Sequence, residues 1–223
     1  MPVVLIIGAS RGIGAELARQ YKADGWRVLA TARAPQDVQQ LTDAGYQAFT
    51  LDVNSLNDCA GLGWHLDDEK IDVAILNAGV YGPRSQTLTS PEQAQFDQVM
   101  HTNVLAAMRL LPVVLPQVEA AHGKLAVISS SMGSISLRPN PAGWLYRASK
   151  AALNSVLKDV SLTTSAAICV ALHPGWLKTD MGGSAADLEV DEGVRRIRSA
   201  IAGLSRSDHG EFIDAVDGSR LSW

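Results

Sequence analysis

The fold of this chain is decided by residues 3–14, VVLIIGASRGIG. The apolar run Val3–Ile7 predicts a buried strand, and the turn Gly8–Gly14 leads directly into a segment with helical spacing, Gly12–Asp24. Glycines permit a tight turn, and a helix N-terminus offers unpaired N–H groups and a positive dipole end. The stretch therefore predicts a site for the pyrophosphate of a dinucleotide. A turn that only joins strand to helix is the alternative, since the spacing G-x-x-x-G-x-G differs from G-x-G-x-x-G.

Similar short apolar runs recur along the chain and alternate with longer segments of helical spacing. Strands that are apolar without alternation are expected to be covered on both faces, as in a parallel sheet between helices. The pattern predicts an α/β fold with a single doubly wound, Rossmann-type parallel sheet, helices on both faces and one domain over residues 1–223. The predicted strands are Val3–Ile7, Arg27–Thr31, Gln47–Leu51, Val73–Leu76, Lys124–Ser129, Ala167–Leu172 and a short one at Glu211–Ile213.

Two further helices are predicted with their ends. Ser90-Pro91-Glu92 indicates an N-cap followed by proline at the first helical position, opening a long helix that we expect to end near Pro112. The second covers Ala148–Val160, with Tyr146 at its start. The apolar stretch Val104–Val118 is interrupted by Arg109 and two prolines, which argues against a membrane span.

Composition narrows the class of protein. The chain has 223 residues, 47% of them hydrophobic, which is enough for one substantial core, and its net charge of −4 argues against nucleic acid or an anionic membrane as a partner. Two distant cysteines and five histidines without ligand spacing predict neither a disulfide framework nor a metal site. The chain begins on its first strand without a charged leader, so we expect a cytoplasmic protein.

The end of the second strand indicates which dinucleotide is bound. An acidic residue there accepts hydrogen bonds from the ribose hydroxyls of NAD, whereas an arginine accommodates the extra phosphate of NADP. The strand ends in Thr31-Ala32-Arg33, and Arg11 in the glycine loop could form the other side of a phosphate clamp. We therefore expect NADP(H) in preference to NAD(H). The alternative is that both arginines are solvated surface charges.

Tyr146 and Lys150 lie four residues apart in a helical segment and hence on one face of it. A neighbouring cation favours phenolate and lowers a tyrosine pKa, so the pair predicts a tyrosine that serves as a general acid or base. An ordinary surface pair is the alternative for this spacing alone. Upstream, Ser129, Ser130 and Ser131 follow a predicted strand, at the rim where open α/β sheets bind ligands, and a hydroxyl there could hold a substrate oxygen.

Taken together and in order, these motifs resemble the short-chain dehydrogenase/reductase family, and within it the short C-factor-like carbonyl reductases. The resemblance rests on the glycine loop, Leu76-Asn77-Ala78-Gly79, Asn103, Ile128-Ser129-Ser130 and Tyr146 with Lys150. It implies that Ser130 steadies the carbonyl oxygen, Tyr146 transfers the proton, Lys150 binds the nicotinamide ribose, and Asn103 completes a proton relay. It further implies a cofactor-binding set of Gly8, Ser10, Arg11, Gly12, Ile13, Gly14, Arg33, Asp52, Val53, Asn77, Ala78, Gly79, Tyr146, Lys150, Pro174, Gly175, Leu177 and Thr179.

Three departures from the family pattern stand out. Ile7 replaces a threonine and Leu76 replaces an asparagine, so some structural hydrogen bonds must be missing or replaced. The interval between serine and tyrosine is also long, which leaves Ser131 as a rival to Ser130 for the substrate oxygen.

The sequence thus predicts an NADP(H)-dependent enzyme that reduces a small-molecule ketone or aldehyde, and the family implies a homodimer or homotetramer. A cofactor-responsive signalling or binding protein of C-factor type is the alternative function. Substrate choice is expected to reside in Tyr81–Thr89, Leu137–Leu145 and Gly182–Glu192, whose composition names no ligand.

Overall fold

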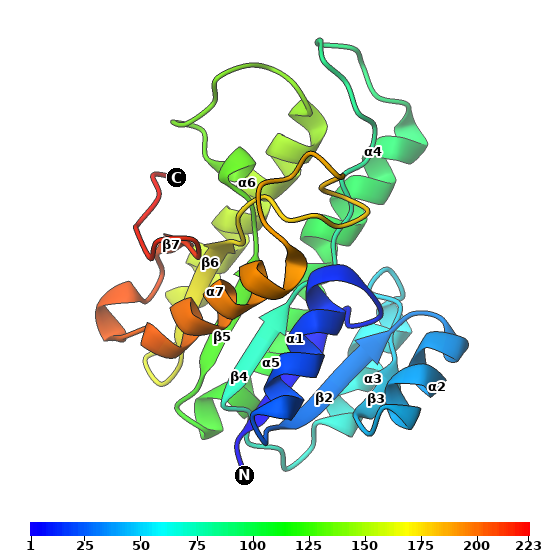
Figure 1. The fold of residues 1–223 in the computed structure, drawn as a ribbon, viewed down its shortest axis with the longest axis vertical. Coiled ribbons are helices and arrows are strands. Elements are labelled where there is room, and N and C mark those ends of the chain that lie inside the picture. The colour runs from blue at the N-terminus through cyan, green and yellow to red at the C-terminus, as the bar shows by residue number, and fades with distance from the viewer.

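A computed structural model describes all residues from Met1 to Trp223 and shows one twisted sheet between two layers of helices (Figure 1). Its seven strands are all parallel and follow the order β3-β2-β1-β4-β5-β6-β7. Their bounds are β1 Val3–Ile7, β2 Arg27–Ala32, β3 Gln47–Thr50, β4 Val73–Leu76, β5 Lys124–Ile128, β6 Ile168–His173 and β7 Phe212–Asp214. The strand order reverses between β1 and β4, and this switch point is where open α/β sheets bind ligands.

The helices cover the two faces of the sheet in separate groups, and central strands such as β1 and β4 are apolar and buried on both faces. One core cluster joins the sheet to α1 (Gly12–Ala23), α2 (Pro35–Asp43) and α7 (Val190–Gly203). The other joins it to α3 (Leu56–His65), α5 (Ala106–Ala120) and α6 (Trp144–Ser161). The remaining short elements are α4 (Gln93–Met100), a π-helical segment at His101–Leu105, and single 3-10 turns at Ser131–Gly133 and Arg206–Asp208. The predicted fold class is therefore confirmed.

The predicted strands agree with the structure to within one residue at each end, whereas the predicted starts of two helices were wrong. The long helix has Glu92, not Ser90, as its N-cap, because Glu92 and Gln95 form a reciprocal capping box. Helix α6 begins at Trp144, four residues before the predicted start, so Tyr146 lies in its first turn.

The prediction that the long helix ends near Pro112 was also wrong. Helix α5 continues through Pro112 and Pro116 to Ala120. Each proline leaves the carbonyl four residues earlier without its helical partner, at Met108 and Pro112. Met108, Pro112 and Pro116 all lie on the exposed stripe of the helix, where water can satisfy those carbonyls.

The helical run Gln93–Ala120 is long and apolar enough to cross a bilayer by length and composition, and half of its most apolar window is buried inside the protein. Packing against α3 and α6 accounts for that burial, as expected of a core helix.

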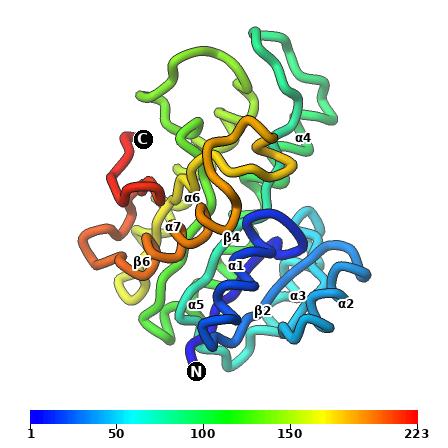
Figure 2. Tube along the Cα trace, viewed as in Figure 1, coloured from blue at the N-terminus to red at the C-terminus, as the bar shows by residue number.

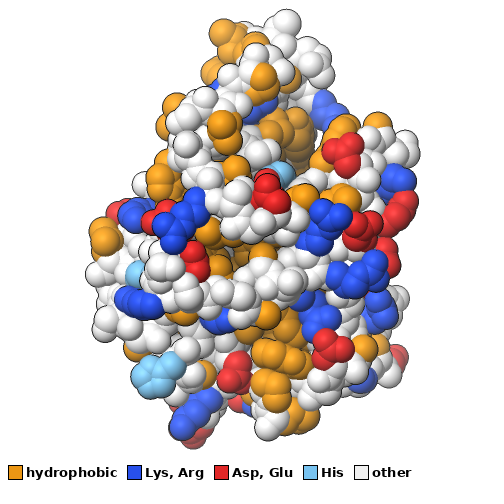
Figure 3. Space-filling view, turned by 60° about the vertical axis from the view of Figure 1, so that its left-hand side comes forward, with side chains coloured by type: hydrophobic (Ala, Val, Ile, Leu, Met, Phe, Trp, Pro, Cys, Tyr) orange, Lys and Arg blue, Asp and Glu red, His pale blue; other side chains and the backbone are white.

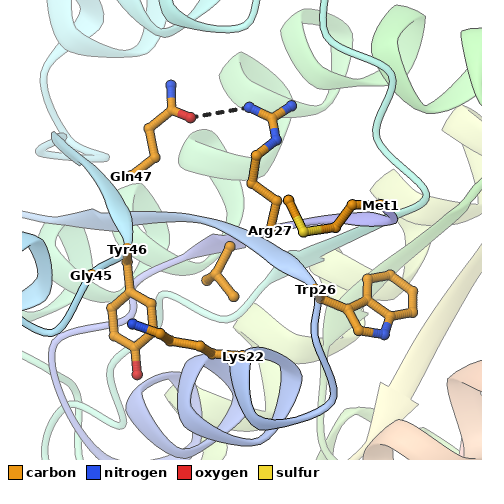
Figure 4. A pocket seen from close by; sticks show the side chains of 8 residues that line it. Met1, Lys22, Trp26, Arg27, Gly45, Tyr46 and Gln47 are labelled. Atoms are coloured by element: carbon orange, nitrogen blue, oxygen red, sulfur yellow. Dashed lines mark hydrogen bonds between the residues drawn. The ribbon is translucent and has the colours of Figure 1, made fainter.

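A hollow of about 440 Å³ lies at the amino ends of the strands and is lined by Lys22, Trp26, Arg27 and Tyr46 among others. Figure 4 shows that Arg27 is turned toward Gln47, to which it donates a hydrogen bond.

Candidate active site

The glycine loop between β1 and α1 is shaped by close backbone contacts that exclude side chains. Gly8 has a φ of +88°, and a Cβ there would lie 3.0 Å from the backbone of Ala78. A Cβ on Gly14 would lie 2.0 Å from the carbonyl oxygen of Gly8. No side chain caps the first turn of α1, so its amides remain available to a ligand. This cradle fits the pyrophosphate of a dinucleotide.

Two hydrogen bonds hold the loop despite the departures at Ile7 and Leu76. The Gly8 amide donates to the Thr31 hydroxyl of β2 at 3.1 Å. The Asn77 side-chain amide donates to the Gly8 carbonyl at 2.7 Å. The Thr31 bond was not predicted, although a threonine at the end of the strand beside β1 was a visible signal.

The two arginines of the predicted phosphate clamp follow neighbouring strands at the same edge. Arg33 comes directly after β2 and is exposed. Arg11 forms an ion pair with Asp180 at 3.2 Å, and both side chains are about four-fifths exposed. Such surface pairs contribute about 0–1 kcal/mol, so Arg11 can exchange Asp180 for a phosphate at little cost.

Tyr146 and Lys150 form a buried pair on the inner face of α6. Tyr146 is 7% exposed and Lys150 is 4% exposed. The Lys150 Nζ lies 5.7 Å from the centroid of the Tyr146 ring and donates a 2.7 Å hydrogen bond to the Ile128 carbonyl at the end of β5. Both groups are enclosed, so the structure excludes the alternative that Tyr146 and Lys150 are an ordinary pair on the surface of a helix.

The expected lowering of the tyrosine pKa by Lys150 is not what this geometry gives. Burial raises the pKa of Tyr146 above its ordinary value, and a hydrogen bond with the Ser130 side chain only partly offsets that rise. Burial also lowers the pKa of Lys150 to about 8. Desolvation dominates both shifts because each group lies inside the protein, where its charged form is disfavoured. Near neutral pH the phenol is therefore protonated and Lys150 remains largely a cation.

The serine that faces Tyr146 is Ser130. Its side chain acts on the pKa of Tyr146, whereas Ser131 begins the 3-10 turn that follows. Ser130 also accepts a hydrogen bond from the Met132 amide at 3.2 Å, which orients its hydroxyl. This arrangement favours Ser130 over Ser131 for contact with a substrate oxygen.

Asn103 lies in the π-helical segment between α4 and α5. Its side-chain oxygen accepts from the Val80 amide and its nitrogen donates to the Val80 carbonyl, both at 2.8 Å. The same nitrogen donates to the Ser149 hydroxyl at 2.9 Å. A Cβ on Gly79 would lie 3.3 Å from the Asn103 oxygen and 3.5 Å from Lys150 Nζ. Asn103 and Lys150 therefore meet over the turn that follows β4, and π-segments of this kind are frequent at functional sites.

The remaining predicted cofactor residues lie around the carboxyl ends of the strands. Val53 is buried beside half-buried Asp52 after β3, and Pro174 is buried after β6. Gly175 has a φ of +87°, and a Cβ there would meet Leu188 and Val216. Buried Leu177 pairs with Leu188 in an isolated β-bridge. In the same loop, the Thr179 side chain lies 3.5 Å from the position of a Cβ built on Gly12. The loop after β6 thus closes onto the glycine loop.

One aromatic contact was missed by sequence reasoning. Tyr81 stacks on Tyr146 with ring centroids 4.6 Å apart and planes at 22°. The sequence had placed Tyr81 only in a segment for substrate choice. Its position two residues beyond Asn77–Gly79, at the carboxyl edge of the sheet, was the available signal.

A dinucleotide cradle and a buried Tyr–Lys pair on one edge of a parallel sheet define a nicotinamide-dependent oxidoreductase. The family model described as short chain dehydrogenase matches residues 2–189. The chain belongs to the short-chain dehydrogenase/reductase family, whose members act on CH–OH and C=O groups with NAD(P). The resemblance inferred from the motifs is confirmed.

Two curated relatives and two solved structures illustrate the match. C-signal of Myxococcus xanthus is 35% identical over 156 residues, covering 69% of this chain and 93% of that protein. Short chain dehydrogenase gsfK of Penicillium aethiopicum is 29% identical over 99% of this chain and 98% of its own length. A carbonyl reductase of Pseudomonas aeruginosa PAO1 in complex with NADP superposes with a TM-score of 0.87 at 35% identity, over all of both chains. A short-chain dehydrogenase/reductase of Burkholderia multivorans with bound NADP gives 0.89 at 29% identity, over 100% of this chain and 99% of the other.

Proposed function

We propose that this enzyme reduces a ketone or aldehyde with NADPH and that Tyr146 gives the carbonyl oxygen its proton. The observation that carries the proposal is the enclosed pair of Tyr146 and Lys150 beside the glycine loop. The dinucleotide, when bound, supplies the hydride. Every other contribution is made by side chains of this chain.

The protonation states suit reduction. Burial raises the pKa of Tyr146, so the phenol holds its proton near neutral pH and can act as a general acid. When the proton leaves, the Lys150 cation, 5.7 Å from the ring centroid, stabilises the phenolate that remains. Ser130, hydrogen bonded to Tyr146, holds the carbonyl oxygen as negative charge develops there.

Lys150 and Asn103 position the reacting groups from the other side. One N–H of Lys150 is used by the Ile128 carbonyl, which leaves two for the ribose hydroxyls that the family resemblance assigns to it. The double hydrogen bond between Asn103 and Val80 fixes the turn beside Lys150, in agreement with a supporting role in proton relay.

We propose NADP(H) as the preferred cofactor. The glycine cradle receives the pyrophosphate, and Arg33 with Arg11 contacts the additional phosphate on the adenine side. The absence of a carboxylate at the end of β2 and the NADP named in the matched P. aeruginosa and B. multivorans structures both support this preference.

A panel of ketones and aldehydes, followed through the absorbance of NADPH, tests the proposal. We expect turnover of at least one compound by the parent and none above background by Tyr146→Phe, with NADPH binding retained in both. Turnover by Tyr146→Phe at the parental rate would contradict the assignment, and a parental preference for NADH would contradict the cofactor.

We also propose a homodimer or homotetramer in the cytoplasm. Phe96 of α4 and Met108 of α5 are large apolar side chains that are 43% and 53% exposed on the long helical run, and burial of this helix between subunits would cover them. Light scattering at micromolar concentration is expected to give at least twice the monomer mass. A strict monomer would contradict this proposal.

The similarity to C-signal favours one second candidate, a protein whose physiological output is signalling or binding rather than turnover. Complementation of a deletion strain separates the two. If Tyr146→Phe abolishes turnover and leaves the cellular phenotype intact, the signalling role holds; if both are lost, catalysis is the physiological role.

A further inference from the structure

Tyr81 is the residue that covers the face of the Tyr146 ring. The two rings are nearly parallel, with planes at 22° and centroids 4.6 Å apart. Tyr81 belongs to the segment after β4, whereas Tyr146 belongs to the first turn of α6. The stack therefore ties the proposed acid to a separate part of the chain.

Tyr81 is itself held by its neighbours. The guanidinium of Arg84 lies 5.0 Å from the Tyr81 ring centroid, and Arg84 donates a 2.7 Å hydrogen bond to the Met181 carbonyl in the loop after β6. The Tyr81 hydroxyl abuts Gly143, where a Cβ would lie only 2.5 Å away. The Gly143 amide in turn donates to the Ser85 carbonyl at 2.9 Å. Three loops thus converge on this one ring.

The loop that contains Met181 also contacts the glycine loop, where we propose that the cofactor binds. Asp180 pairs with Arg11, and Thr179 lies against Gly12, so residues 179–181 touch the glycine loop on one side and Arg84 on the other. The placement of Tyr81 is therefore connected to the loop that encloses the proposed pyrophosphate site.

The energies involved are sufficient to orient a side chain. An aromatic stack stabilises its geometry beyond the effect of burial, and a cation–π contact adds to that. A proton donor displaced by about 1 Å from the reacting oxygen can lose about a hundredfold in rate. Contacts that fix the plane of the Tyr146 ring can thus influence turnover without touching the substrate.

We propose that Tyr81 is a positioning residue for Tyr146, and that Arg84 holds Tyr81 against it. This inference rests on the proposed role of Tyr146 as the acid. Tyr81 fixes the plane of the phenol, while Arg84 and Gly143 fix Tyr81. The titratable groups against the Tyr146 ring are Lys150 from α6 and Tyr81 from the segment after β4, and Arg84 packs on the Tyr81 ring.

A merely structural role of Tyr81 would reduce folding, NADPH affinity and kcat together. A positioning role reduces kcat and leaves NADPH affinity intact, because the glycine loop does not depend on the Tyr81 ring. Recovery of kcat in Tyr81→Phe, which keeps the ring, is a second readout that a general loss of packing would not give.

The experiment compares Tyr81→Ala, Tyr81→Phe and Arg84→Gln with the parent, using NADPH and an aldehyde that the parent reduces. For Tyr81→Ala we expect kcat to fall about tenfold to hundredfold and NADPH affinity to stay within about twofold. Tyr81→Phe keeps the ring and should restore most of kcat. Arg84→Gln should lower kcat about twofold to fivefold, the equivalent of one exposed cation–π contact.

Arg206→Gln is the matched control, since Arg206 also donates to a main-chain carbonyl, that of Ala167, at the amino edge of the sheet. It should leave kcat unchanged. The proposal is overturned if Tyr81→Ala retains parental kcat. It is also overturned if Tyr81→Ala loses folding and NADPH binding together while Arg84→Gln behaves like Arg206→Gln. Parental turnover by Tyr146→Phe would instead overturn the proposed function.

Discussion

The carboxyl edge of the sheet is divided into two regions that are built differently. Around the glycine loop, the backbone segments at Gly8, Gly14 and Ala78 are in direct contact. They approach so closely that a methyl group added to either glycine would not fit. At the top of the view, the loops after β4 and β5 stand out from the body of the protein (Figures 1 and 2) and are mostly exposed. A few side-chain bonds join them, such as that from Trp144 to the Thr89 carbonyl.

The difference also appears in charge. Residues 80–91 and 134–143 carry one charged residue each, Arg84 and Arg138. In the face shown in Figure 3, charged side chains lie across the middle and the lower part of the molecule, and the top is largely uncharged. The proposed cofactor region is thus defined by backbone shape and local cations, whereas the proposed substrate region is a surface with few charges that side chains can remodel. Substitutions should therefore have large effects in the first region and graded effects in the second.

The largest effect is expected at Gly14. In Gly14→Ala the new methyl would meet the Gly8 carbonyl at 2.0 Å and the Asn77 amide at 2.7 Å, so the loop must shift. We expect the free energy of unfolding to fall by about 3 kcal/mol and NADPH affinity to fall at least about a hundredfold, since several charge-assisted hydrogen bonds depend on the loop. Urea unfolding and fluorescence titration measure both.

Gly61→Ala is the matched control for that substitution. Gly61 lies inside α3 and a Cβ there meets nothing within 4 Å, so alanine should raise the free energy of unfolding by about 0.5–1 kcal/mol. Equal behaviour of the two alanine variants would contradict the account of a loop closed by backbone contact.

Lys150→Met should separate function from stability. Turnover should fall about a hundredfold or more. The free energy of unfolding at pH 7 should rise by about 1–2 kcal/mol, because relief of a buried charge exceeds the cost of leaving the Ile128 carbonyl unpaired. Lys158→Met is the control, since Lys158 lies on the exposed face of the same helix and also donates to a carbonyl, that of Gly210. Its stability should change by less than about 0.5 kcal/mol.

The pH dependence of that stabilisation has a definite sign. The pKa of Lys150 is about 8 in the folded protein and 10.5 for an unperturbed lysine. Between these values the unfolded chain binds more protons, so the parent gains stability as the pH rises. The advantage of Lys150→Met should therefore be full below pH 8 and shrink toward pH 10.5. An advantage that grows across this range would contradict the burial of a charged lysine.

A smaller effect is expected at Arg33. Loss of a charge-assisted contact with the adenine-side phosphate should lower the ratio of kcat/KM for NADPH over NADH about tenfold to hundredfold in Arg33→Ala. Arg19→Ala, which removes an exposed arginine paired with Glu16 on α1, is the control. An unchanged ratio in Arg33→Ala would show that Arg33 is only a solvated charge.

The smallest effect is expected in the upper loops. Trp144→Phe removes the hydrogen bond to Thr89 and little else, because the indole is 36% exposed. Stability should change by less than about 1 kcal/mol, and KM for a carbonyl substrate should shift more than KM for NADPH. A loss comparable with that of Gly14→Ala would remove the distinction between the two regions.

The sequence predicted the strands, the glycine turn and the shared face of Tyr146 and Lys150 well, because the constraints on these features are local. Strand periodicity, glycine spacing and the i, i+4 relation of Tyr146 and Lys150 can each be recognised within a few residues. Contacts that depend on the whole fold were not visible, such as the hydroxyl of Thr31 at Gly8 or the stack of Tyr81 on Tyr146. Pro112 misled the prediction because the pattern did not show which face of α5 is exposed. The pKa of Tyr146 was misjudged for a similar reason, since spacing reveals a neighbouring cation but not the depth of burial.

The central claim is that a buried, protonated Tyr146 gives its proton to the carbonyl oxygen. The rate of a single turnover of enzyme-bound NADPH with an aldehyde, measured against pH in the parent and in Tyr146→Phe, tests it most directly. The account predicts a parental rate that is constant through neutral pH and falls on the alkaline side, and a Tyr146→Phe rate that is lower by about a hundredfold or more at neutral pH. A parental rate that rises with pH, or a Tyr146→Phe rate equal to it, would contradict the account.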